Sequence, residues 1–464
     1  MSHSNSSPKA STPASSRIIS DLDRALSDLM KQWAITSGDT GLNERQATAQ
    51  AIIEMALADY ADLIRKVERK ASGGVKRRVA HATAWLLDTS DAKIAAMVRS
   101  MAGREPVCLP AELLAKAATL SVWQPLTEAV RVYWLPKTAD KFRPIVAYGP
   151  LRKAQGLMVR DMLMVAGVDT STNFAVKGAG GESGLVNRIC TLMNEGKDWW
   201  WTPDIKSAFP SMHRGHFRWL GMDRRLLLNI VYLPKCARIE VKLPKDAEAF
   251  SAYLKDTHPD LPVDASLKDI TKLMVRRGLP QGSVLSPLLA GALVAHMWGQ
   301  TFCLPDAVVL SWHDDLHVST ETKAQIKQVK EQFTHAMASL PAGPIEFHES
   351  PVLPANSQRV TALGYLFQPG RGHLHFDSGS RSIHVRPGRK RIGRFKQRLA
   401  EKLATAPDAD ARLLLTETYT LQWFNSQTAW TKVPAFSWMN ADNCAITYLL
   451  DFENGQPMGG GWIV

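Results

Sequence analysis

The stretch that decides the fold is AVVLSWHDDLHVS, residues 307–319. Two apolar runs, rich in β-branched residues, flank a short polar tip, and this pattern predicts two strands joined as a β-hairpin. Asp314 and Asp315 are neighbours at the tip, where their negative charges repel each other. A bound divalent cation commonly offsets such repulsion. An Asp pair is also common in an ordinary turn. The stretch alone therefore leaves a metal site and a plain turn both open.

A second acidic segment comes earlier, in WWWTPDIKSAF, residues 199–209. The aromatic run predicts a strand that ends at Asp204 and is followed by a turn of small and polar residues. Taken alone, an Asp after a strand most often caps a helix. A reaction that uses two metal ions, however, needs carboxylates on rigid backbone, as both segments would provide. Because a strand alternates its faces, at least one of the three Trp rings must enter the core.

A glycine-containing turn lies between the two acidic segments, in GLPQGSVLSPLL, residues 278–289. It opens directly onto an apolar run that predicts a helix as far as about Trp298. Gly282 lets the backbone approach a ligand closely, and the N–H groups at a helix start suit a phosphate. A capped helix with a tight turn would explain Gly282, Ser283 and Ser286. It leaves Gln281 without a role.

A basic hairpin is predicted in LPKTADKFRPIV, residues 135–146. Lys137 and Arg143 could bind a triphosphate there, with the guanidinium of Arg143 binding in bidentate fashion. Considered by itself, the segment is more typical of a solvated β-turn.

The four segments, in this order and spacing, resemble the conserved motifs of the reverse-transcriptase family. The matches are the fingers motif in residues 135–145, the first palm Asp motif in 204–209, the LPQGSxxSP motif in 279–287 and the aromatic-x-Asp-Asp motif in 312–315. Leu363-Gly364-Tyr365 resembles the primer-grip turn, and Arg152 and Gln155 resemble the segment after the fingers hairpin. The resemblance covers about residues 131–367, and the combination is far more specific than any one motif.

This resemblance implies a right-hand polymerase of fingers, palm and thumb that adds dNTPs to a primer 3′ end. It implies that Asp204 and Asp314 bind two Mg²⁺ ions, or Mn²⁺, with the Ile205 carbonyl completing one site and Asp315 supporting them. The implied nucleotide-binding residues are Lys137, Arg143, Phe209, Gln281 and Gly282. Phe209 lies where the family keeps an aromatic ring beneath the sugar, so a ribose 2′-hydroxyl should collide with it.

Two positions depart from the family pattern. Trp312 stands where relatives have Tyr or Phe, and it is followed by an unusual residue, His313, which we expect to pack rather than titrate. Many relatives also carry a Lys between the Asp-Asp hairpin and the primer grip, but residues 344–351 contain none. His348 could replace that Lys as a general acid for pyrophosphate.

Composition divides the chain around these segments. Residues 1–16 are rich in Ser, Pro and Thr and predict a disordered tail. Apolar residues recur at helical spacing within residues 17–130, which predicts an α-helical N-terminal extension. Residues 131–370 mix short strands with helices and predict an α+β core that holds the fingers and palm. Residues 371–464 return to a helical pattern, which we assign to the thumb and C-terminal region.

The charge balance favours a polyanionic partner, because 56 Lys and Arg against 44 Asp and Glu give a net charge of +12. A basic run at residues 65–78 is slightly more typical of a solvated helix face than of an RNA contact. Cations at the start of the thumb are predicted to follow a nucleic-acid backbone, with a solvated helix face as the alternative: Arg386, Arg389, Lys390, Arg391, Arg394, Lys396 and Arg398.

The five cysteines are scattered and unpaired in sequence, which indicates reduced thiols rather than a zinc site. No apolar run approaches the roughly 18 residues of a membrane span, and the N-terminus lacks the apolar core of a signal peptide. We therefore expect a cytoplasmic protein without a membrane partner.

The architecture most resembles the solitary bacterial reverse transcriptases of retron, abortive-infection and phage-defence type. No segment like RNase H or a metal-binding endonuclease follows the expected thumb. We expect an RNA template, with a cognate noncoding RNA as the favoured candidate, and a DNA product or primer, in antiviral defence. Template-independent or protein-primed DNA synthesis, RNA-directed RNA synthesis and a non-catalytic RNA-binding scaffold remain alternatives. A homo-oligomer or a partner protein is also possible.

Overall fold

The computed structural model describes residues 12–426 apart from several gaps. The gaps are residues 126–127, 139–140, 171, 176–179, 258–265, 302–305, 358–359 and 370–382. The chain forms two compact units, each built from three segments. The first unit comprises Met1–Ala179, Asp204–Phe302 and Gln332–His348, and the second comprises Gly180–Pro203, Cys303–Glu331 and Glu349–Val464.

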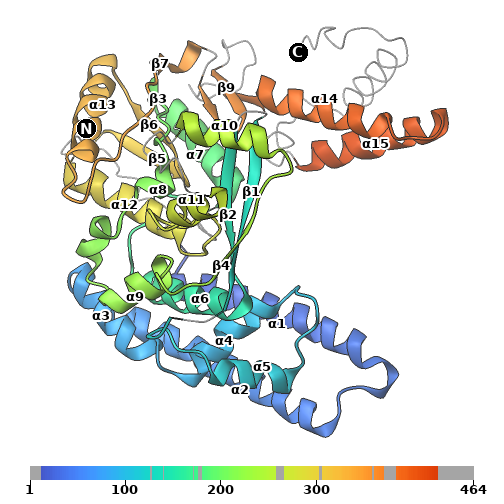
Figure 1. The fold of residues 1–464 in the computed structure, drawn as a ribbon. Helices are drawn as coiled ribbons and strands as arrows, with labels where there is room; N and C mark the ends of the chain where they lie inside the picture. The colour runs from blue at the N-terminus through green and yellow to red at the C-terminus, as the bar shows by residue number, and fades with distance from the viewer. Residues whose placement is uncertain are drawn as a thin grey trace, which may run out of the picture. The chain divides into compact units, whose positions relative to one another are not determined.

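Five helices and a short 3₁₀ turn begin the first unit, as the blue part of Figure 1 shows. They pack on one another and on α6 (Pro150–Val165) through apolar faces that repeat at helical spacing. Their bounds are α1 (Ala14–Ser37), η1 (Gly38–Thr40), α2 (Glu44–Lys70), α3 (Val75–Leu86), α4 (Ser90–Met101) and α5 (Pro110–Ala118).

The first helix begins earlier than the sequence pattern suggested. Glu68 of α2 accepts hydrogen bonds from the backbone N–H groups of Ala14, at 2.7 Å, and Ser15, at 3.2 Å, and from the Ser15 hydroxyl. A carboxylate satisfies the unpaired N–H groups of a helix start and suits its positive dipole. Residues 14–16, expected in the disordered tail, therefore belong to α1. Residues 1–11 lie outside the described residues.

A buried ion pair fixes the helical layer on α6. Asp161 of α6 is fully buried and accepts hydrogen bonds from the Arg99 guanidinium, at 3.0 Å for the Nη1 atom, and from the Tyr60 hydroxyl, at 3.0 Å. Burial raises the pKa of Tyr60 well above its ordinary value, and the charge of Asp161 raises it further. The hydroxyl therefore stays protonated and donates to the carboxylate.

A three-stranded sheet in order β2-β1-β4 follows the helices. β1 (Val130–Thr138) pairs antiparallel with β2 (Lys141–Ala147) and parallel with β4 (Ile239–Lys242). Trp134 and Phe142 point from one face into a cluster with Phe250. That cluster is covered by α10 (Ala247–Thr257) and α11 (Leu267–Met274). The basic hairpin expected in residues 135–146 is therefore present, with the opposite face left exposed at Leu135 and Arg143.

Short helical turns and one long apolar helix complete the first unit. The long helix α12 (Ser286–Thr301) is almost wholly buried over its first ten residues, because its sequence is apolar on every side. The other elements are α8 (Ala208–Ser211), η2 (Arg214–Leu220), α9 (Arg224–Leu226) and η3 (Leu227–Val231). Helix α13 (Lys323–Ala338) starts in the second unit and ends in the first.

The second unit contains a four-stranded sheet in order β5-β6-β3-β7, following α7 (Gly181–Asn194). Its strands are β5 (Val308–Trp312), β6 (Asp315–Thr320), β3 (Trp199–Trp201) and β7 (Val352–Pro354), and all neighbours are antiparallel. Trp200 and Trp201 are each 1% exposed, and because neighbouring residues of a strand point to opposite faces, both faces of β3 are covered there. Two of the three Trp rings therefore enter the core, where at least one was expected.

A second small sheet and a helical hairpin end the described chain. After η4 (Ala355–Ser357), the strands β8 (Thr361–Ala362), β9 (Tyr365–Pro369) and β10 (Ile383–Pro387) form an antiparallel sheet in order β10-β9-β8. Helices α14 (Arg389–Leu403) and α15 (Ala409–Ser426) then pack side by side (Figure 1) around Phe395, Leu399 and Leu403. The expected change to helix beyond residue 370 is wrong for β10, which pairs with β9.

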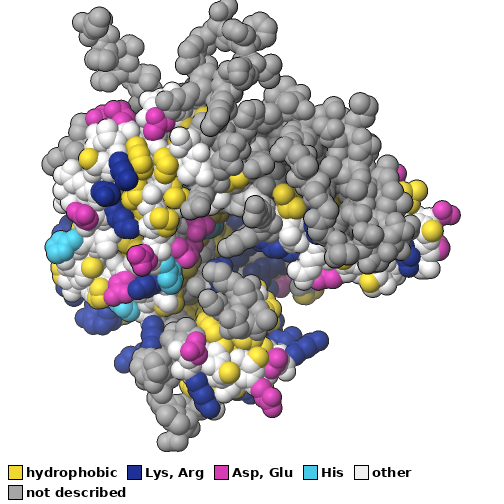
Figure 2. All heavy atoms as spheres, turned by 90° about the horizontal axis from the view of Figure 1, so that it is seen from above, with side chains coloured by type: hydrophobic (Ala, Val, Ile, Leu, Met, Phe, Trp, Pro, Cys, Tyr) yellow, Lys and Arg dark blue, Asp and Glu magenta, His cyan; other side chains and the backbone are white. Residues whose placement is uncertain are grey.

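The observed elements confirm an α+β class in which helices dominate. Among the described residues, no helix is both long and apolar enough to cross a membrane. On the face shown in Figure 2, described Lys and Arg side chains alternate with Asp and Glu.

Candidate active site

Asp204 stands on a short antiparallel bridge in the first unit. Ile205 pairs with Phe347, the Lys206 N–H donates to the Glu346 carbonyl, and the His348 N–H donates to the Asp204 carbonyl, both at 2.8 Å. Ile205 is buried, and strand alternation places Asp204 and His348 on the opposite side of the bridge. Both of those side chains are exposed. The pairing thus presents one carboxylate and one imidazole from a common, rigid edge.

The bridge leaves one carbonyl unpaired at this edge. Ile205 and Phe347 form a pair that exchanges no hydrogen bonds of its own, since the two bonds come from the residues on either side. The Ile205 carbonyl accepts no hydrogen bond from any residue that the structure describes. It is therefore available to a ligand next to Asp204.

The chain turns sharply between Asp204 and Phe209. Ser207 has φ 46° and ψ 48°, a left-handed conformation that costs an ordinary residue roughly 1–2 kcal/mol. The turn starts α8 and leaves the Phe209 side chain half-buried. The Phe209 carbonyl accepts a hydrogen bond from the Leu279 N–H at 2.8 Å, and a Cβ on Gly278 would lie 2.2 Å from that oxygen. The glycine therefore permits the close contact.

The other end of the same loop packs on strand β2. The Val146 N–H donates to the Gln281 carbonyl at 2.7 Å. Gly282 has φ 103°, and a Cβ there would lie 2.3 Å from the Val146 carbonyl oxygen. Both the conformation and the space require glycine at this position. Arg143 lies three residues before Val146 on the same strand, with its side chain exposed.

The two serines of this segment form hydrogen bonds within the turn, whereas the Gln281 side-chain oxygen does not. The Ser286 hydroxyl donates to the Pro280 carbonyl at 2.8 Å, and the Leu285 N–H donates to the Ser283 hydroxyl at 3.2 Å. The two serines thus shape the turn, as a capped helix predicts. The Gln281 Oε1 atom is buried and has no hydrogen-bond partner among the described residues. An unpaired buried acceptor of this kind costs about 1–3 kcal/mol unless water or a ligand satisfies it.

Three of the four motif segments therefore converge within the first unit: the turn after Asp204, the Gln281-Gly282 loop and strand β2. Lys137 lies on β1, but its side chain is outside the described residues. The strand and loop partners Val146 and Phe347 were not identified from the sequence. They act through backbone atoms, so residue type gives no signal for them.

The Asp-Asp hairpin belongs to the second unit and has the expected form. Trp312 pairs with Asp315, which leaves a two-residue turn of His313 and Asp314. His313 has φ 57°, in the left-handed region where histidine is less disfavoured than most side chains. Asp314 is half-buried and Asp315 is exposed.

Neighbouring strands support this turn. The Leu316 N–H donates to the Pro203 carbonyl at 3.3 Å, so the residue after Asp315 is bonded to the residue that precedes Asp204 in the chain. His317 of β6 is 4% exposed, and burial lowers its pKa to about 4. This histidine is neutral near pH 7.

The Leu363-Gly364-Tyr365 segment, which resembles a primer-grip turn, contains a two-residue connection between β8 and β9. Leu363 and Gly364 have φ values of 53° and 79°, the signs that a type I′ hairpin turn requires. Among the described residues, only Ser207, His313 and Leu363 are non-glycine residues with positive φ. Each lies in a different motif segment, and such strain tends to concentrate at functional sites.

The cations predicted to contact nucleic acid differ in their surroundings. Arg391 pairs with Glu182 at 3.0 Å, and its guanidinium lies 4.2 Å from the centre of the Tyr365 ring, so it is bound within the protein. Arg394 and Arg398 are exposed on α14, and Lys396 is half-buried. The side chains of Arg386, Arg389 and Lys390 lie outside the described residues.

The candidate ligands of a metal are distributed over both units. Asp204 and Ile205 belong to the first unit, and Asp314 and Asp315 to the second. Among the described residues, no group of three or more His, Cys, Asp or Glu side chains is gathered so that it could hold a metal ion.

No family model and no curated protein matches the chain. Among solved structures, the chain is similar to the Sicinivirus 3Dpol RNA-dependent RNA polymerase at 12% sequence identity and a TM-score of 0.35. The match covers 71% of this chain and 69% of that chain. A likeness of this size defines neither the fold nor the function.

Proposed function

We propose that this chain is a nucleic-acid polymerase of the reverse-transcriptase type, an RNA-directed DNA polymerase with a right-hand arrangement of fingers, palm and thumb. One observation carries the proposal. The Gly278–Gly282 loop is bonded at one end to Phe209 and at the other end to Val146, through contacts that only glycine permits. Three segments that match separate polymerase motifs thus come together, although they are far apart in sequence.

The donor atoms fit the metal that such a reaction uses. Asp204, Asp314, Asp315 and the Ile205 carbonyl offer the oxygen ligands that Mg²⁺ prefers, and the Ile205 carbonyl accepts no hydrogen bond from a described residue. These residues would hold two Mg²⁺ ions, for which Mn²⁺ could substitute. When bound, the ions would lower the pKa of the primer 3′-hydroxyl and neutralise the leaving pyrophosphate.

The remaining residues would position the incoming nucleotide. Arg143, exposed on β2, and Lys137 would bind the triphosphate, since a guanidinium can donate two hydrogen bonds to one phosphate. Gln281 Oε1 would accept a hydrogen bond from the nucleotide, which would satisfy its buried oxygen. Gly282 would allow the backbone to approach the substrate. The exposed cations of α14, Arg394 and Arg398, would contact the nucleic-acid backbone.

Phe209 would select the sugar. Its half-buried ring stands five residues after Asp204, where it would exclude a ribose 2′-hydroxyl and favour dNTPs. Phe209→Val should raise rNTP use relative to dNTP use about tenfold or more, because specificity from packing contacts is worth about 1–3 kcal/mol. Phe217→Val, in the fully buried core, controls for a general loss of packing. An unchanged ratio in Phe209→Val would remove this role.

The substrate class and the product can be tested together. The purified protein is incubated with its co-purified RNA and either labelled dNTPs or labelled rNTPs, and the products are sequenced. DNA that copies the bound RNA is the expected result. Untemplated DNA would favour the template-independent or protein-primed alternative, and a preference for rNTPs would favour RNA synthesis.

The same experiment addresses the non-catalytic alternative and the biological role. No product with either nucleotide set would contradict the polymerase proposal and favour an RNA-binding scaffold. The proposed role is synthesis on a cognate noncoding RNA in bacterial anti-phage defence. Protection against phage that requires both the RNA and active polymerase would support that role.

His348 is proposed as the general acid that protonates pyrophosphate. Its backbone is hydrogen-bonded to Asp204, and alternation places both exposed side chains on the same side of the bridge. His348→Ala should change the shape of the pH-rate profile, whereas His335→Ala on α13 should not. An unchanged profile in His348→Ala would remove the role without affecting the polymerase proposal.

A further inference from the structure

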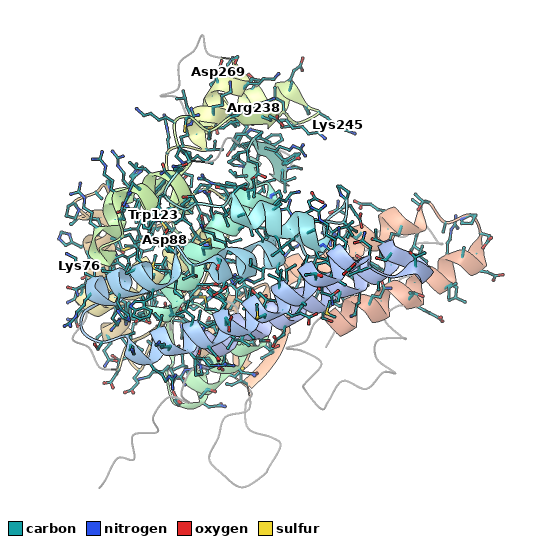
Figure 3. All side chains as sticks on the ribbon, turned by 90° about the horizontal axis from the view of Figure 1, so that it is seen from below. Lys76, Asp88, Trp123, Arg238, Lys245 and Asp269 are labelled. Atoms are coloured by element: carbon teal, nitrogen blue, oxygen red, sulfur yellow. The ribbon has the colours of Figure 1, made fainter. Side chains whose placement is uncertain are left out.

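A second cationic feature lies in the first unit, on the surface of the neighbouring helices α2 and α3. Two exposed lysines of α2 lie beside the exposed ring of Trp85 on α3, and three further exposed cations lie on the same two helices; we call this surface the basic corner. Its cations are Lys66, Arg69 and Lys70 of α2 and Lys76 and Arg77 of α3. Figure 3 shows Lys76 at the outer edge of the helical layer.

Trp85 holds two of the lysines in place. Lys66 and Lys70 are four residues apart on α2 and therefore share a helix face. Their Nζ atoms lie 5.4 Å and 5.6 Å from the centre of the Trp85 ring. The cation–π contacts restrict two otherwise flexible side chains and keep both ammonium groups at one place on the surface. Trp85 itself remains 40% exposed.

The charge of the basic corner is not balanced locally. None of its five cations forms an ion pair with a carboxylate among the described residues. The carboxylates that are near in sequence have other partners. Glu68 caps α1, and Asp62 pairs with Arg65.

Asp88, three residues after Trp85, is also engaged away from the five cations. It accepts a hydrogen bond from the Trp123 indole N–H at 2.6 Å (Figure 3). An anion from outside the chain would therefore find cations whose nearby acids are already paired.

We propose that the basic corner binds single-stranded nucleic acid. The ammonium groups of Lys66 and Lys70 would bind phosphates, and a base would stack on the exposed part of Trp85. Cations beside an exposed aromatic ring are the combination by which proteins hold unpaired strands, because every base offers a π face. A duplex offers phosphates but keeps its base faces inside the stack, so the corner should prefer a single strand.

This proposal does not rest on the polymerase assignment. All the residues involved belong to the helices α2 and α3, and none is among those proposed for nucleotide addition. Loss of DNA synthesis in an Asp204→Asn variant would leave binding at the corner unchanged. The two proposals can therefore fail separately.

Binding can be measured with the full chain by fluorescence anisotropy, using labelled oligo(U), oligo(dT) and a blunt duplex of equal length. Trp85→Leu should weaken single-strand binding roughly 5- to 100-fold, the range expected when one stacked base is lost, and should change duplex binding little. The oligo(U) and oligo(dT) arms show whether RNA or DNA is the preferred strand. Equal unfolding midpoints of the variant and the wild type would show that the fold is kept.

Lysine variants supply a second, independent readout. Lys66→Gln combined with Lys70→Gln should reduce the slope of log affinity against log salt by about 1.4, because each phosphate contact on a single strand contributes about 0.7. Arg65→Gln, at a cation already paired with Asp62, is the matched control and should leave the slope unchanged. Wild-type single-strand binding by Trp85→Leu, or an unchanged slope in the lysine variant, would overturn the proposal.

Discussion

The Gln281-Gly282 loop of the first unit and the Asp314-Asp315 turn of the second unit are both tight turns in motif segments. They differ in the residue that adopts a positive φ, which is a glycine in the loop and a histidine in the hairpin turn. The loop uses glycine where the chain must have φ 103° and lie against the Val146 carbonyl. The hairpin turn places His313 at φ 57°, where glycine would be relaxed. The first turn is constrained by its neighbours, whereas the second carries strain of its own. Replacing Gly282 should therefore lower the free energy of unfolding, whereas replacing His313 with glycine should raise it.

The largest effect is expected at Gly282. Gly282→Ala would place a Cβ 2.3 Å from a backbone oxygen and force an L-residue to adopt a positive φ. Strain and overpacking together should lower the free energy of unfolding by about 3 kcal/mol or more. Denaturant unfolding of the purified variant measures the change.

Gly299 of α12 is the matched control, because a Cβ there would meet nothing within 4 Å and its φ is not positive. Gly299→Ala should increase the free energy of unfolding by about 0.5–1 kcal/mol, as alanine does in an exposed helix. A Gly282→Ala variant as stable as wild type would mean that the loop is not fixed against β2.

A smaller effect is expected from pH in the second unit. His317 has its pKa lowered from 6.5 to about 4 by burial, so the unfolded chain binds more protons than the folded chain between these values. Its contribution to stability is present above about pH 6.5 and is lost as the pH falls towards 4, by roughly 3 kcal/mol in total. Unfolding midpoints of wild type and His317→Leu at pH 7 and pH 4.5 measure this pH-dependent contribution of His317 to stability.

The His317→Leu variant should lose less stability than wild type on acidification, since it lacks the buried imidazole. His216 is a histidine of the first unit whose pKa is also lowered by burial, so it can be compared with His317 of the second unit. Its Nδ1 atom accepts from the His213 N–H at 2.9 Å and its Nε2 atom lies 2.9 Å from the Gly343 carbonyl. An equal acid sensitivity of wild type and His317→Leu would contradict a neutral, buried His317.

The smallest effect is expected at the strained turns. Leu363→Asn and His313→Gly should each increase the free energy of unfolding by about 0.5–1 kcal/mol, because asparagine and glycine tolerate positive φ better than leucine and histidine. Thermal unfolding measures both changes. A decrease in either variant would show that the side chain makes contacts worth more than the strain.

Local features of this fold could be predicted from the sequence. The strand, tip and strand of residues 307–319, the basic hairpin at Arg143 and the helical N-terminal region all follow from periodicity and turn residues over short windows. Ser283 and Ser286, which follow the Gly278–Gly282 loop, also form the hydrogen bonds expected of a tight turn. In each case the residues that decide the structure are close together in the chain.

Features that depend on distant partners could not be predicted. The start of α1 is set by Glu68, and the edge that carries Asp204 is set by Phe347. Strand β10 forms because β9 is available to pair with it. Such partners contribute backbone groups or one carboxylate, which leave no periodic signal in a single sequence.

The basic corner illustrates the same limit for a candidate site. Its lysines were visible in the sequence as a charge run, which is usually a solvated helix face. Trp85 lies on a different helix, and only the packing of α3 beside α2 brings its ring to Lys66 and Lys70. The sequence therefore revealed the charge but not the aromatic ring beside it.

Primer extension on an RNA template, with Mg²⁺ and dNTPs, tests the central claim most directly when Asp204→Asn and Asp314→Asn are each compared with wild type. Asp28→Asn, at an exposed carboxylate of α1, is the matched control and should retain wild-type activity. Each of the two variants should lose about a thousandfold in rate, equivalent to about 4 kcal/mol of transition-state stabilisation. Wild-type rates in either Asp204→Asn or Asp314→Asn would contradict a catalytic role for that carboxylate and, with it, the proposed polymerase site.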